Sequence, residues 1–486
     1  MKVVMFVYND AIFDSRVLRE AGTLALAGHE VTLMATLRSG GDGPPEHERR
    51  DGFEIVRLAV PRAWPWWWGR LANARFHRDR AGQLWHRSTR FRSFNPRGAV
   101  AGLRGMIASG CLVVLQRLWF ATGDRRPRGT PGTTSDGEPA NEPPWPPETA
   151  SWLASWRWSI LGWAEAAAVA APLADVYHGH DLTGLPAALG AARRNGGKVV
   201  YDSHDIYVEA GRAATRPAWA RRWLRWIESR WTRRIAALVS VNDAYADVLA
   251  RRLRPPQTVI VHNCPPRWEP PAEPVDHLRQ AAGIDPRDPV VLFHGGFGPH
   301  RGLAELAAAM LQPGLESAHL VYLGYGSRRG EIDALVADPR FGGRLHVLDA
   351  VAPAVLLDWI TTADVDAIPF QHSTLNHYLC TPNKLFESLA AGVPVVLSDF
   401  PVMSGIVLRD PAGPVGAACR PDDPVSIGAA ISSILALDPA ARADLRRRCL
   451  TAAHERWNWE TESPKLVELY AHLGVVAHDA AGPGLG

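Results

Sequence analysis

The stretch KVVMFVYNDAIFDSRVLREAGTLALAGHEVTLMA, residues 2–35, decides the fold class of this protein. Its apolar residues form two short runs, at 3–7 and 31–35, and between these runs they recur at the spacing of one helix face. Gly28 follows the helical part, at a position where helices commonly end. We therefore predict a strand–helix–strand unit, which is the building block of a parallel sheet.

The same alternation runs through both halves of the chain. Further strands of the first half are predicted at residues 53–60, 175–180, 198–204, 237–241 and 258–263. After a proline-rich stretch, five strands of a second series are predicted at residues 289–296, 320–324, 345–348, 365–369 and 394–398. Residues 424–473 are predicted to be helical throughout. This pattern predicts two doubly wound α/β domains joined by a proline-rich linker.

Composition narrows the class of protein. A length of 486 residues fits two domains with insertions. The net charge of +3 is close to balance and gives no global argument for nucleic-acid binding. Five cysteines without paired spacing indicate reduced thiols and a cytoplasmic protein. The N-terminal apolar run has strand length rather than signal-peptide length, and no uncharged apolar run reaches the roughly 18 residues of a spanning helix.

A basic insertion interrupts the first domain. Residues 62–128 contain fourteen arginines against two aspartates, and the tryptophans cluster at 64–68. The stretch 64–92 resembles an interfacial anchor, with aromatic rings at headgroup depth and guanidinium groups on anionic lipid. A poorly ordered basic loop is the alternative, whereas nucleic-acid binding is disfavoured because no binding fold accompanies the charge. The Gly/Pro/Ser/Thr-rich run at 125–149 is predicted to be disordered.

Two loops of the second half are suited to a phosphate, because ligands of open α/β sheets bind beyond the carboxyl ends of the strands. The glycines of the loop 295–302 would let backbone N–H groups approach a phosphate while Arg301 supplies charge. A tight turn with a solvated arginine is the alternative. Thr381 is predicted to cap the next candidate helix, with Pro382 at its first position.

Lys384 and Glu387 lie in the first turns of that helix. The chain has only four lysines beside 49 arginines, so Lys384 is not its usual cation, and an ammonium group suits a phosphate oxygen. Glu387 would accept hydrogen bonds from ribose hydroxyls. The alternative is an ordinary capped core helix with an exposed glutamate.

Polar residues also follow the strands of the first half. The loop 9–16 follows the first strand, and the sequences His-Gly-His-Asp at 178–181 and Asp-Ser-His-Asp at 202–205 follow two later ones. Imidazoles and carboxylates of neighbouring strands would then converge at one edge. One alternative is a metal site, although no third ligand has a convincing spacing. The other is that the histidines form structural hydrogen bonds.

These motifs together resemble a known family. The matching residues are Asp14-Ser-Arg-Val-Leu-Arg-Glu-Ala, Ala27-Gly-His-Glu-Val-Thr-Leu, His178-Gly-His-Asp, Tyr201-Asp-Ser-His-Asp, Val261-His-Asn-Cys-Pro, His294-Gly-Gly, Arg301-Gly, Leu323-Gly-Tyr-Gly and Thr381-Pro-Asn-Lys-Leu-Phe-Glu-Ser-Leu-Ala-Ala-Gly-Val-Pro-Val-Val. In this order, over residues 1–60 and 170–470, the chain resembles the retaining glycosyltransferase family 4 enzymes of the GT-B fold.

The resemblance implies two Rossmann-like domains facing a central cleft, a nucleotide-sugar donor on the C-terminal domain, an acceptor on the N-terminal domain, and no obligatory metal or other cofactor. It assigns catalysis to His204, Arg301, Lys384 and Glu387. It assigns donor binding to Gly295, Gly296, Gly326, Thr381, Pro382 and Asn383. It assigns acceptor binding to Asn9, Asp14, Arg16 and Asp181.

Two departures from the family pattern affect these roles. The family often has a second glutamate eight residues before Glu387, where this chain has Leu379, so recognition of the donor sugar is expected from Asn376 or His377. Many members also have an arginine where this chain has Gly296. We expect a weaker phosphate clamp.

The expected domains are 1–270, with the insertion at 61–165, and 277–455, followed by a helix at 456–473 that packs back across the junction and a flexible tail at 474–486. The expected function is retaining sugar transfer to a saccharide or lipid-linked acceptor in cell-surface polysaccharide or glycolipid biosynthesis. The alternatives are a UDP-sugar 2-epimerase and a non-catalytic binding module at the membrane. We expect a cytoplasmic protein, peripheral at the inner face of the plasma membrane, without nucleic-acid partners.

Overall fold

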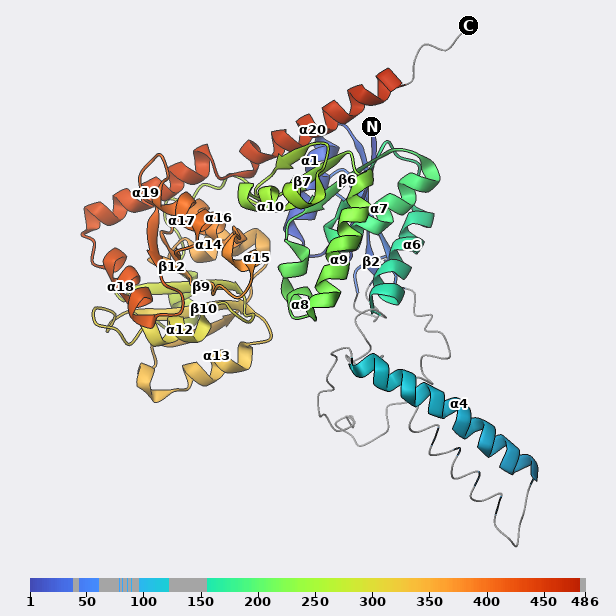
Figure 1. Ribbon diagram of the computed structural model, residues 1–486. Coiled ribbons are helices and arrows are strands. Elements are labelled where there is room, and N and C mark those ends of the chain that lie inside the picture. The colour runs from blue at the N-terminus through green and yellow to red at the C-terminus, as the bar shows by residue number, and fades with distance from the viewer. Residues whose placement is uncertain are drawn as a thin grey trace.

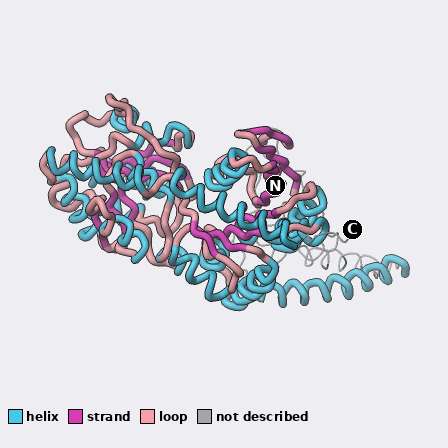
Figure 2. Tube along the Cα trace, turned by 90° about the horizontal axis from the view of Figure 1, so that it is seen from above, coloured by secondary structure: helices cyan, strands magenta, loops and turns pink. Residues whose placement is uncertain are grey.

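The structure is a computed structural model that describes residues 1–37, 43–60, 78, 81, 85, 89, 96–121 and 155–480. Apart from those four single residues, the tryptophan- and arginine-rich stretch at 64–92 lies outside the described part of the chain, as does the run at 125–149. Predictions about both stretches therefore stay predictions. Figure 1 shows two α/β domains, and a view from above shows them side by side, each with its strands enclosed by helices (Figure 2).

The N-terminal domain is built on one sheet, which has eight strands within the described residues. They are β1 (Lys2–Phe6), β2 (Glu30–Leu37), β3 (His47–Arg50), β4 (Phe53–Ala59), β5 (Val176–His180), β6 (Lys198–Ser203), β7 (Ala237–Ser240) and β8 (Thr258–Ile260). Their order is β3-β4-β2-β1-β5-β6-β7-β8, and every pairing is parallel except that of β3 with β4. β3 is an antiparallel edge strand of charged residues that the apolar pattern did not predict.

Helices cover both faces of this sheet. They are α1 (Ser15–Leu26), α6 (Leu161–Ala170), α7 (Asp181–Asn195), α8 (Gly211–Ala214), α9 (Ala218–Trp231) and α10 (Asp243–Leu253), and α4 (Pro96–Ala121) projects from the domain (Figure 1). α1 begins where the Asp14 side chain accepts from the N–H of Val17, and the chain turns at Gly28 with a φ of +86°. β1 is apolar almost throughout because both faces of the sheet are covered.

The C-terminal domain has a second sheet, with six strands in the described chain and only parallel pairings. In the order β11-β10-β9-β12-β13-β14 they are β11 (Leu345–Asp349), β10 (His319–Tyr325), β9 (Val290–Gly296), β12 (Val365–Ile368), β13 (Val395–Ser398) and β14 (Gly416–Cys419). Five of these were predicted. β14 was missed because its sequence, Gly-Ala-Ala-Cys, has no β-branched or large apolar residue.

The helices of this domain are α11 (His277–Ala282), α12 (Leu303–Ala309), α13 (Arg329–Val336), α14 (Leu356–Ile360), α15 (Leu375–Tyr378), α16 (Asn383–Ala390), α17 (Pro401–Leu408), α18 (Pro424–Leu435) and α19 (Pro439–Glu455). The last helix, α20 (Trp459–Ala480), crosses back over the N-terminal domain (Figure 1). There the indole N–H of Trp459 donates to Thr23 Oγ1 at 2.8 Å, and Lys198 Nζ donates to the Leu473 carbonyl. The two domains are therefore held together by this helix as well as by the linker.

Within the described residues no single helix is long and apolar enough to span a membrane. One bent pair of helices, Pro424–Leu435 with Pro439–Gly474, meets the length and composition of a span only when taken together.

Candidate active site

Lys384, on α16, has an unpaired ammonium group inside the C-terminal domain. The side chain is only 7% exposed, and its Nζ has no hydrogen-bond partner in the described structure. Nζ lies 3.5 Å from the centroid of the Phe293 ring, which stabilises it by a cation–π contact. Burial lowers the pKa of Lys384 to about 7. Asp366 and Glu387 act on Lys384 electrostatically, but neither accepts a hydrogen bond from it. A buried cation without a hydrogen-bonded carboxylate is costly, so this position is suited to an anion that arrives from outside.

The start of α16 lies beside this cation and differs from the prediction. The helix begins at Asn383, with Pro382 as its N-cap and no side chain capping the first turn. The predicted capping role of Thr381 is therefore wrong, because its Oγ1 instead accepts from Asn242 Nδ2 of the other domain at 3.2 Å. The uncapped N–H groups and the helix dipole favour negative charge at this point.

The glycine-rich loop between β9 and α12 supplies the second cation. Arg301 stacks on Phe370, with Cζ 4.0 Å from the ring centroid. Gly295 has a φ of +98°, and a Cβ there would lie 3.7 Å from Lys384 Nζ. Gly302 must be glycine, because its φ is +68° and a Cβ would lie 2.2 Å from the Pro369 carbonyl oxygen. The loop thus brings its backbone and one guanidinium close to Lys384.

Two further glycines predicted to bind the donor, Gly296 and Gly326, do not lie against the side chains of Lys384 or Arg301. Gly296 ends β9 and is exposed, with open space where a Cβ would be. Gly326, after β10, has a φ of +153°, and a Cβ there would lie 2.4 Å from the Phe297 carbonyl oxygen. Gly326 therefore keeps the neighbouring turn close to the loop, which is a structural reason for glycine independent of any ligand.

Glu387 is held one turn further along α16. Its Oε2 contacts His294 Nε2 at 3.1 Å, while His294 Nδ1 lies 3.3 Å from Asp366. Burial alone would lower the pKa of His294, but Asp366 and Glu387 outweigh it and raise the pKa to about 9. Against the effect of its own burial, the contact with His294 lowers the pKa of Glu387. The carboxylate is therefore ionised at neutral pH and keeps Oε1 without a partner among the described residues.

The N-terminal domain has a contrasting cluster at the ends of β5 and β6. Arg16 is fully buried and donates from Nε and Nη2 to the two oxygens of Asp202, at 2.8 and 3.0 Å, and from Nη1 to the Val261 carbonyl at 2.8 Å. Nη2 also lies 3.0 Å from Glu20. The predicted acceptor-binding Arg16 is thus engaged on all sides by the protein itself, and we do not carry it into the proposed function.

His204 and Asp181 form a pair at the surface of this cluster. His204 Nε2 lies 2.9 Å from Asp181 Oδ2, and the two side chains are 24% and 27% exposed. Although burial opposes it, Asp181 raises the pKa of His204 well above its usual range. Asp181 begins α7 with a φ of +53°, an uncommon conformation for a residue other than glycine. His204 is therefore protonated at neutral pH and suited to donate a hydrogen bond rather than to accept a proton.

Asn9 and Asp14 shape the loop before α1. Asn9 Nδ2 donates to Asp14 Oδ2 at 2.8 Å, and Asn9 Oδ1 accepts from the N–H of Ala11. Both side chains are accessible at the surface, and both have a local structural role as well.

Contacts across the junction bring the two clusters to the same region. Asn376 Nδ2 donates to Asp205 Oδ1 at 2.8 Å, and Asn263 Nδ2 donates to Asn383 Oδ1 at 2.9 Å. Arg301 interacts electrostatically with Asp205, and Arg19 does so with Glu387. Asn376 is thus engaged by the N-terminal domain, and His377 contacts Ser373 at 2.7 Å. Neither observation tests their expected contact with the donor sugar.

Four buried residues meet the distance requirement of a metal site. Ligand atoms of Glu20, His178, His180 and Asp202 lie within 4.8 Å of one another. Glu20 is the neighbour that the sequence argument missed, although its spacing from Arg16, four residues along α1, was a signal. Because the Arg16 guanidinium already holds both oxygens of Asp202 and neighbours Glu20, it supplies the positive charge that a metal would bring.

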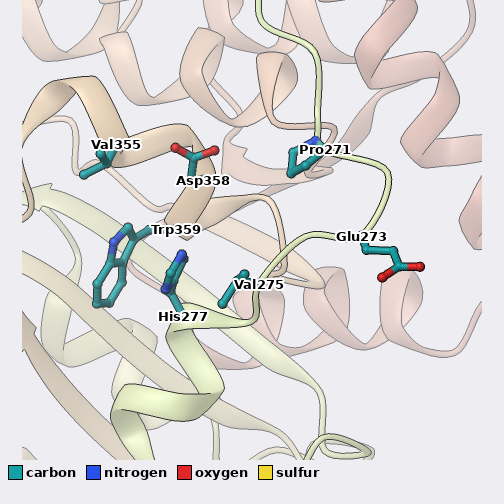
Figure 3. A pocket seen from close by; sticks show the side chains of 7 residues that line it. All are labelled: Pro271, Glu273, Val275, His277, Val355, Asp358 and Trp359. Carbon is teal, nitrogen blue, oxygen red and sulfur yellow. The ribbon is translucent and has the colours of Figure 1, made fainter.

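A pocket with a volume of about 290 Å³ lies elsewhere in the C-terminal domain, between the linker and α14. Figure 3 shows the side chains that line it. It is lined by Pro271, Glu273, Val275, His277, Val355, Asp358 and Trp359. None of the predicted site residues lines it.

Family comparisons agree with the division of the chain. The profile described as "Glycosyltransferase Family 4" matches residues 118–264, in the N-terminal domain. The profile described as "Glycosyl transferases group 1" matches residues 288–436, in the C-terminal domain. A comparison with curated protein sequences gives no significant match.

Solved structures share the fold over almost the whole length. A sucrose-phosphate synthase from Thermosynechococcus elongatus is similar with a TM-score of 0.62 at 16% identity, covering 98% of this chain and 100% of that one. The catalytic domain of starch synthase IV from Arabidopsis thaliana, bound to ADP and acarbose, gives 0.59 at 12% identity, with 97% and 99% covered. The Anabaena protein HepE, in complex with UDP and glucose, gives 0.57 at 12% identity, with 97% and 100% covered.

The predicted GT-B fold and the predicted family resemblance are both confirmed. By the profile matches to its two domains, the chain is a glycosyltransferase of the GT-B fold that resembles family 4.

Proposed function

We propose that this glycosyltransferase moves a hexose from a nucleotide-sugar donor, with retention of anomeric configuration, to a saccharide or lipid-linked acceptor in cell-surface polysaccharide or glycolipid biosynthesis. The observation that carries the donor part is Lys384, a buried ammonium at the uncapped start of α16 whose Nζ has no hydrogen-bond partner among the described residues. The complexes of the similar starch synthase and of HepE contain ADP and UDP, which supports a nucleoside diphosphate as the occupant.

The residues around Lys384 divide the donor between them. Lys384 and Arg301 neutralise the diphosphate, and the N–H groups at the start of α16 add hydrogen bonds. The free oxygen of Glu387 accepts from the ribose hydroxyls. As the bond between the anomeric carbon and the phosphate oxygen breaks, negative charge grows on the diphosphate, and the two cations stabilise it. The acceptor oxygen bonds to the anomeric carbon, and its proton passes to the departing phosphate.

The acceptor side is assigned to the exposed pair of Asp181 and His204, together with Asn9 and Asp14. Protonated His204 donates a hydrogen bond to a hydroxyl of the transferred sugar near the anomeric carbon. The Asp181 carboxyl group orients that imidazolium and accepts from an acceptor hydroxyl. We place the reaction in the cytoplasm, because all five cysteines are free thiols, as expected in a reducing compartment. No divalent metal is required, since the protein supplies two cations of its own.

The test is nucleotide release from UDP-, GDP-, ADP- and dTDP-sugars, with and without a membrane-lipid extract as the source of acceptor. We expect release from one donor only when the extract is present. Lys384→Met should reduce that release by about 100-fold or more, since it removes one fixed charge from the leaving group. Lys2→Met is the matched control, because Lys2 is an exposed lysine far from the site, and it should leave the rate unchanged.

The other outcomes separate the competing functions. Release or rearrangement of the donor without any acceptor would replace transfer by epimerisation. Binding of nucleotide without release from any donor would make the protein a binding module. Inversion at the anomeric carbon of the product, measured by nuclear magnetic resonance, would overturn retention alone.

A further inference from the structure

One face of α9, on the N-terminal domain, exposes alternating tryptophans and arginines. The helix buries Ala220, Leu224 and Glu228 against the domain. Its outer face has residues three or four positions apart, which places them in one stripe. We call this the α9 stripe; it consists of Trp219, Arg222, Trp226, Arg230 and, in the turn that follows, Arg233. Trp219 is 44% exposed and Trp226 is 62% exposed.

The α9 stripe has positive charge without local compensation. Residues 211–234 contain eight arginines and a single acidic residue, Glu228. Two of these arginines, Arg221 and Arg225, lie off the stripe and pair with Glu209. Glu228 points inward, where it contacts Tyr201 and Arg252. Arg222, Arg230 and Arg233 have no ion pair in the described structure. The stripe therefore combines large, exposed aromatic rings with three arginines that have no ion-pair partner among the described residues.

A second helix adds an exposed apolar surface. α4 contains three arginines and no acidic residue along its 26 residues. Between 42% and 62% of the side chain is exposed at the apolar positions Val100, Leu103, Ile107 and Val114. These positions share one face, and Figure 1 shows α4 projecting from the N-terminal domain on the side of α8 and α9, away from the C-terminal domain. An apolar face on a helix that projects from its domain needs a partner surface.

We propose that the α9 stripe and the apolar face of α4 together dock the N-terminal domain on an anionic lipid bilayer. Tryptophan rings favour the headgroup region, guanidinium groups pair with lipid phosphates, and an apolar helix face enters the acyl boundary. An acidic protein would match the arginines but would leave the tryptophans and the aliphatic face of α4 without a suitable environment. The inference does not depend on the donor site, because neither helix contains a residue of it.

The experiment is co-sedimentation of the full-length protein with vesicles, using phosphatidylglycerol in phosphatidylcholine against phosphatidylcholine alone. We expect binding only with the anionic lipid, and weaker binding as salt is raised, because the charges lie at the surface. The triple variant Arg222→Glu, Arg230→Glu and Arg233→Glu should lose about tenfold or more in binding. Leu103→Asp with Ile107→Asp on α4 should reduce it as well.

Matched controls separate the surface from net charge and from folding. Arg193→Glu, Arg194→Glu and Arg409→Glu make the same charge change at exposed arginines on other faces and should leave binding unchanged. Trp226→Ala removes the more exposed ring of the stripe and should also weaken binding. Leu26→Ala is its control and should leave binding unchanged, since Leu26 is 90% exposed on α1. Donor binding by calorimetry should be normal in every variant, which shows that each one folds. Equal binding to neutral vesicles, unchanged binding in the triple variant, or binding to soluble polyglutamate in place of vesicles would overturn the proposal.

Discussion

Each domain has a buried cation near the carboxyl edge of its sheet, Arg16 in the N-terminal domain and Lys384 in the C-terminal domain. The two differ in whether the protein itself supplies a carboxylate that is hydrogen-bonded to the cation. In the N-terminal domain Arg16 meets the two oxygens of Asp202, neighbours Glu20 and donates to a backbone carbonyl. In the C-terminal domain Lys384 has no hydrogen-bond partner among the residues that the structure describes, and Arg301 lies on the face of an aromatic ring. The charge of Arg16 is therefore balanced by carboxylates of the protein, whereas Lys384 can still accept an anionic ligand. This difference distinguishes a structural charge cluster from a binding site more clearly than burial does, since Arg16 and Lys384 are both buried.

The largest expected effect is a change in the free energy of unfolding when each buried cation is removed. We expect a large loss for Arg16 and no loss for Lys384. Arg16→Ala would leave Asp202 and Glu20 buried without their cation, and we expect it to cost about 3–5 kcal/mol of the free energy of unfolding. Lys384→Met removes an unpaired buried cation and keeps its volume, so stability should stay the same or rise. Urea denaturation of both variants beside the wild type measures the contrast. A stable Arg16→Ala protein or an unstable Lys384→Met protein would break the comparison.

The sequence predicted much of this arrangement because local patterns determine it. The apolar runs identified twelve of the fourteen strands within the described residues, and the order of these strands on the chain predicted the sheet edge where His204, Asp181, Lys384 and Glu387 lie. β3 and β14 escaped because one is charged and the other consists of small residues. Element patterns are reliable where burial repeats along the chain.

Pairings between distant residues were beyond the sequence argument. The family resemblance assigned Arg16 to acceptor binding, whereas in the structure Asp202, 186 residues later, accepts hydrogen bonds from it. Threonine is a common helix N-cap, but the Oγ1 of Thr381 accepts a hydrogen bond from Asn242 of the other domain and does not cap α16. Such outcomes depend on which partner the tertiary fold brings near, and no local rule contains that information. The unpaired state of Lys384, which is the best indication of the donor site, is for the same reason visible only in the structure.

A smaller expected effect is a pH dependence of stability that arises from Glu20 in the N-terminal cluster. Burial raises the pKa of Glu20 to about 7, so the folded protein keeps this proton between about pH 4.5 and 7 while the unfolded chain releases it. Stability contributed by the protonated form is therefore present at low pH and is lost as pH rises through this window, by on the order of 2 kcal/mol. Glu20→Gln keeps the neutral form and should lack this loss, as measured by denaturation from pH 5 to 7. Glu165→Gln, at an exposed glutamate of α6, should follow the wild type; a Glu20→Gln variant that does the same would contradict the assignment.

The smallest expected effect is a pH dependence of donor binding. It arises because Lys384 can lose its charge near neutral pH, whereas an arginine cannot. Because burial lowers the pKa of Lys384 to about 7, the free protein loses this charge as pH rises above 7, while the phosphates of a nucleotide sugar keep theirs. Donor binding should then take up a proton and weaken by about tenfold between pH 7 and 8.5, or about 1.4 kcal/mol. Calorimetry in two buffers of different ionisation enthalpy measures both quantities. Lys384→Arg keeps its charge at every pH in this range, so its affinity should be independent of pH, whatever its absolute value. If the wild type binds the donor equally at both pH values without proton uptake, Lys384 already has a counter-ion in solution, and the contrast with Arg16 does not hold.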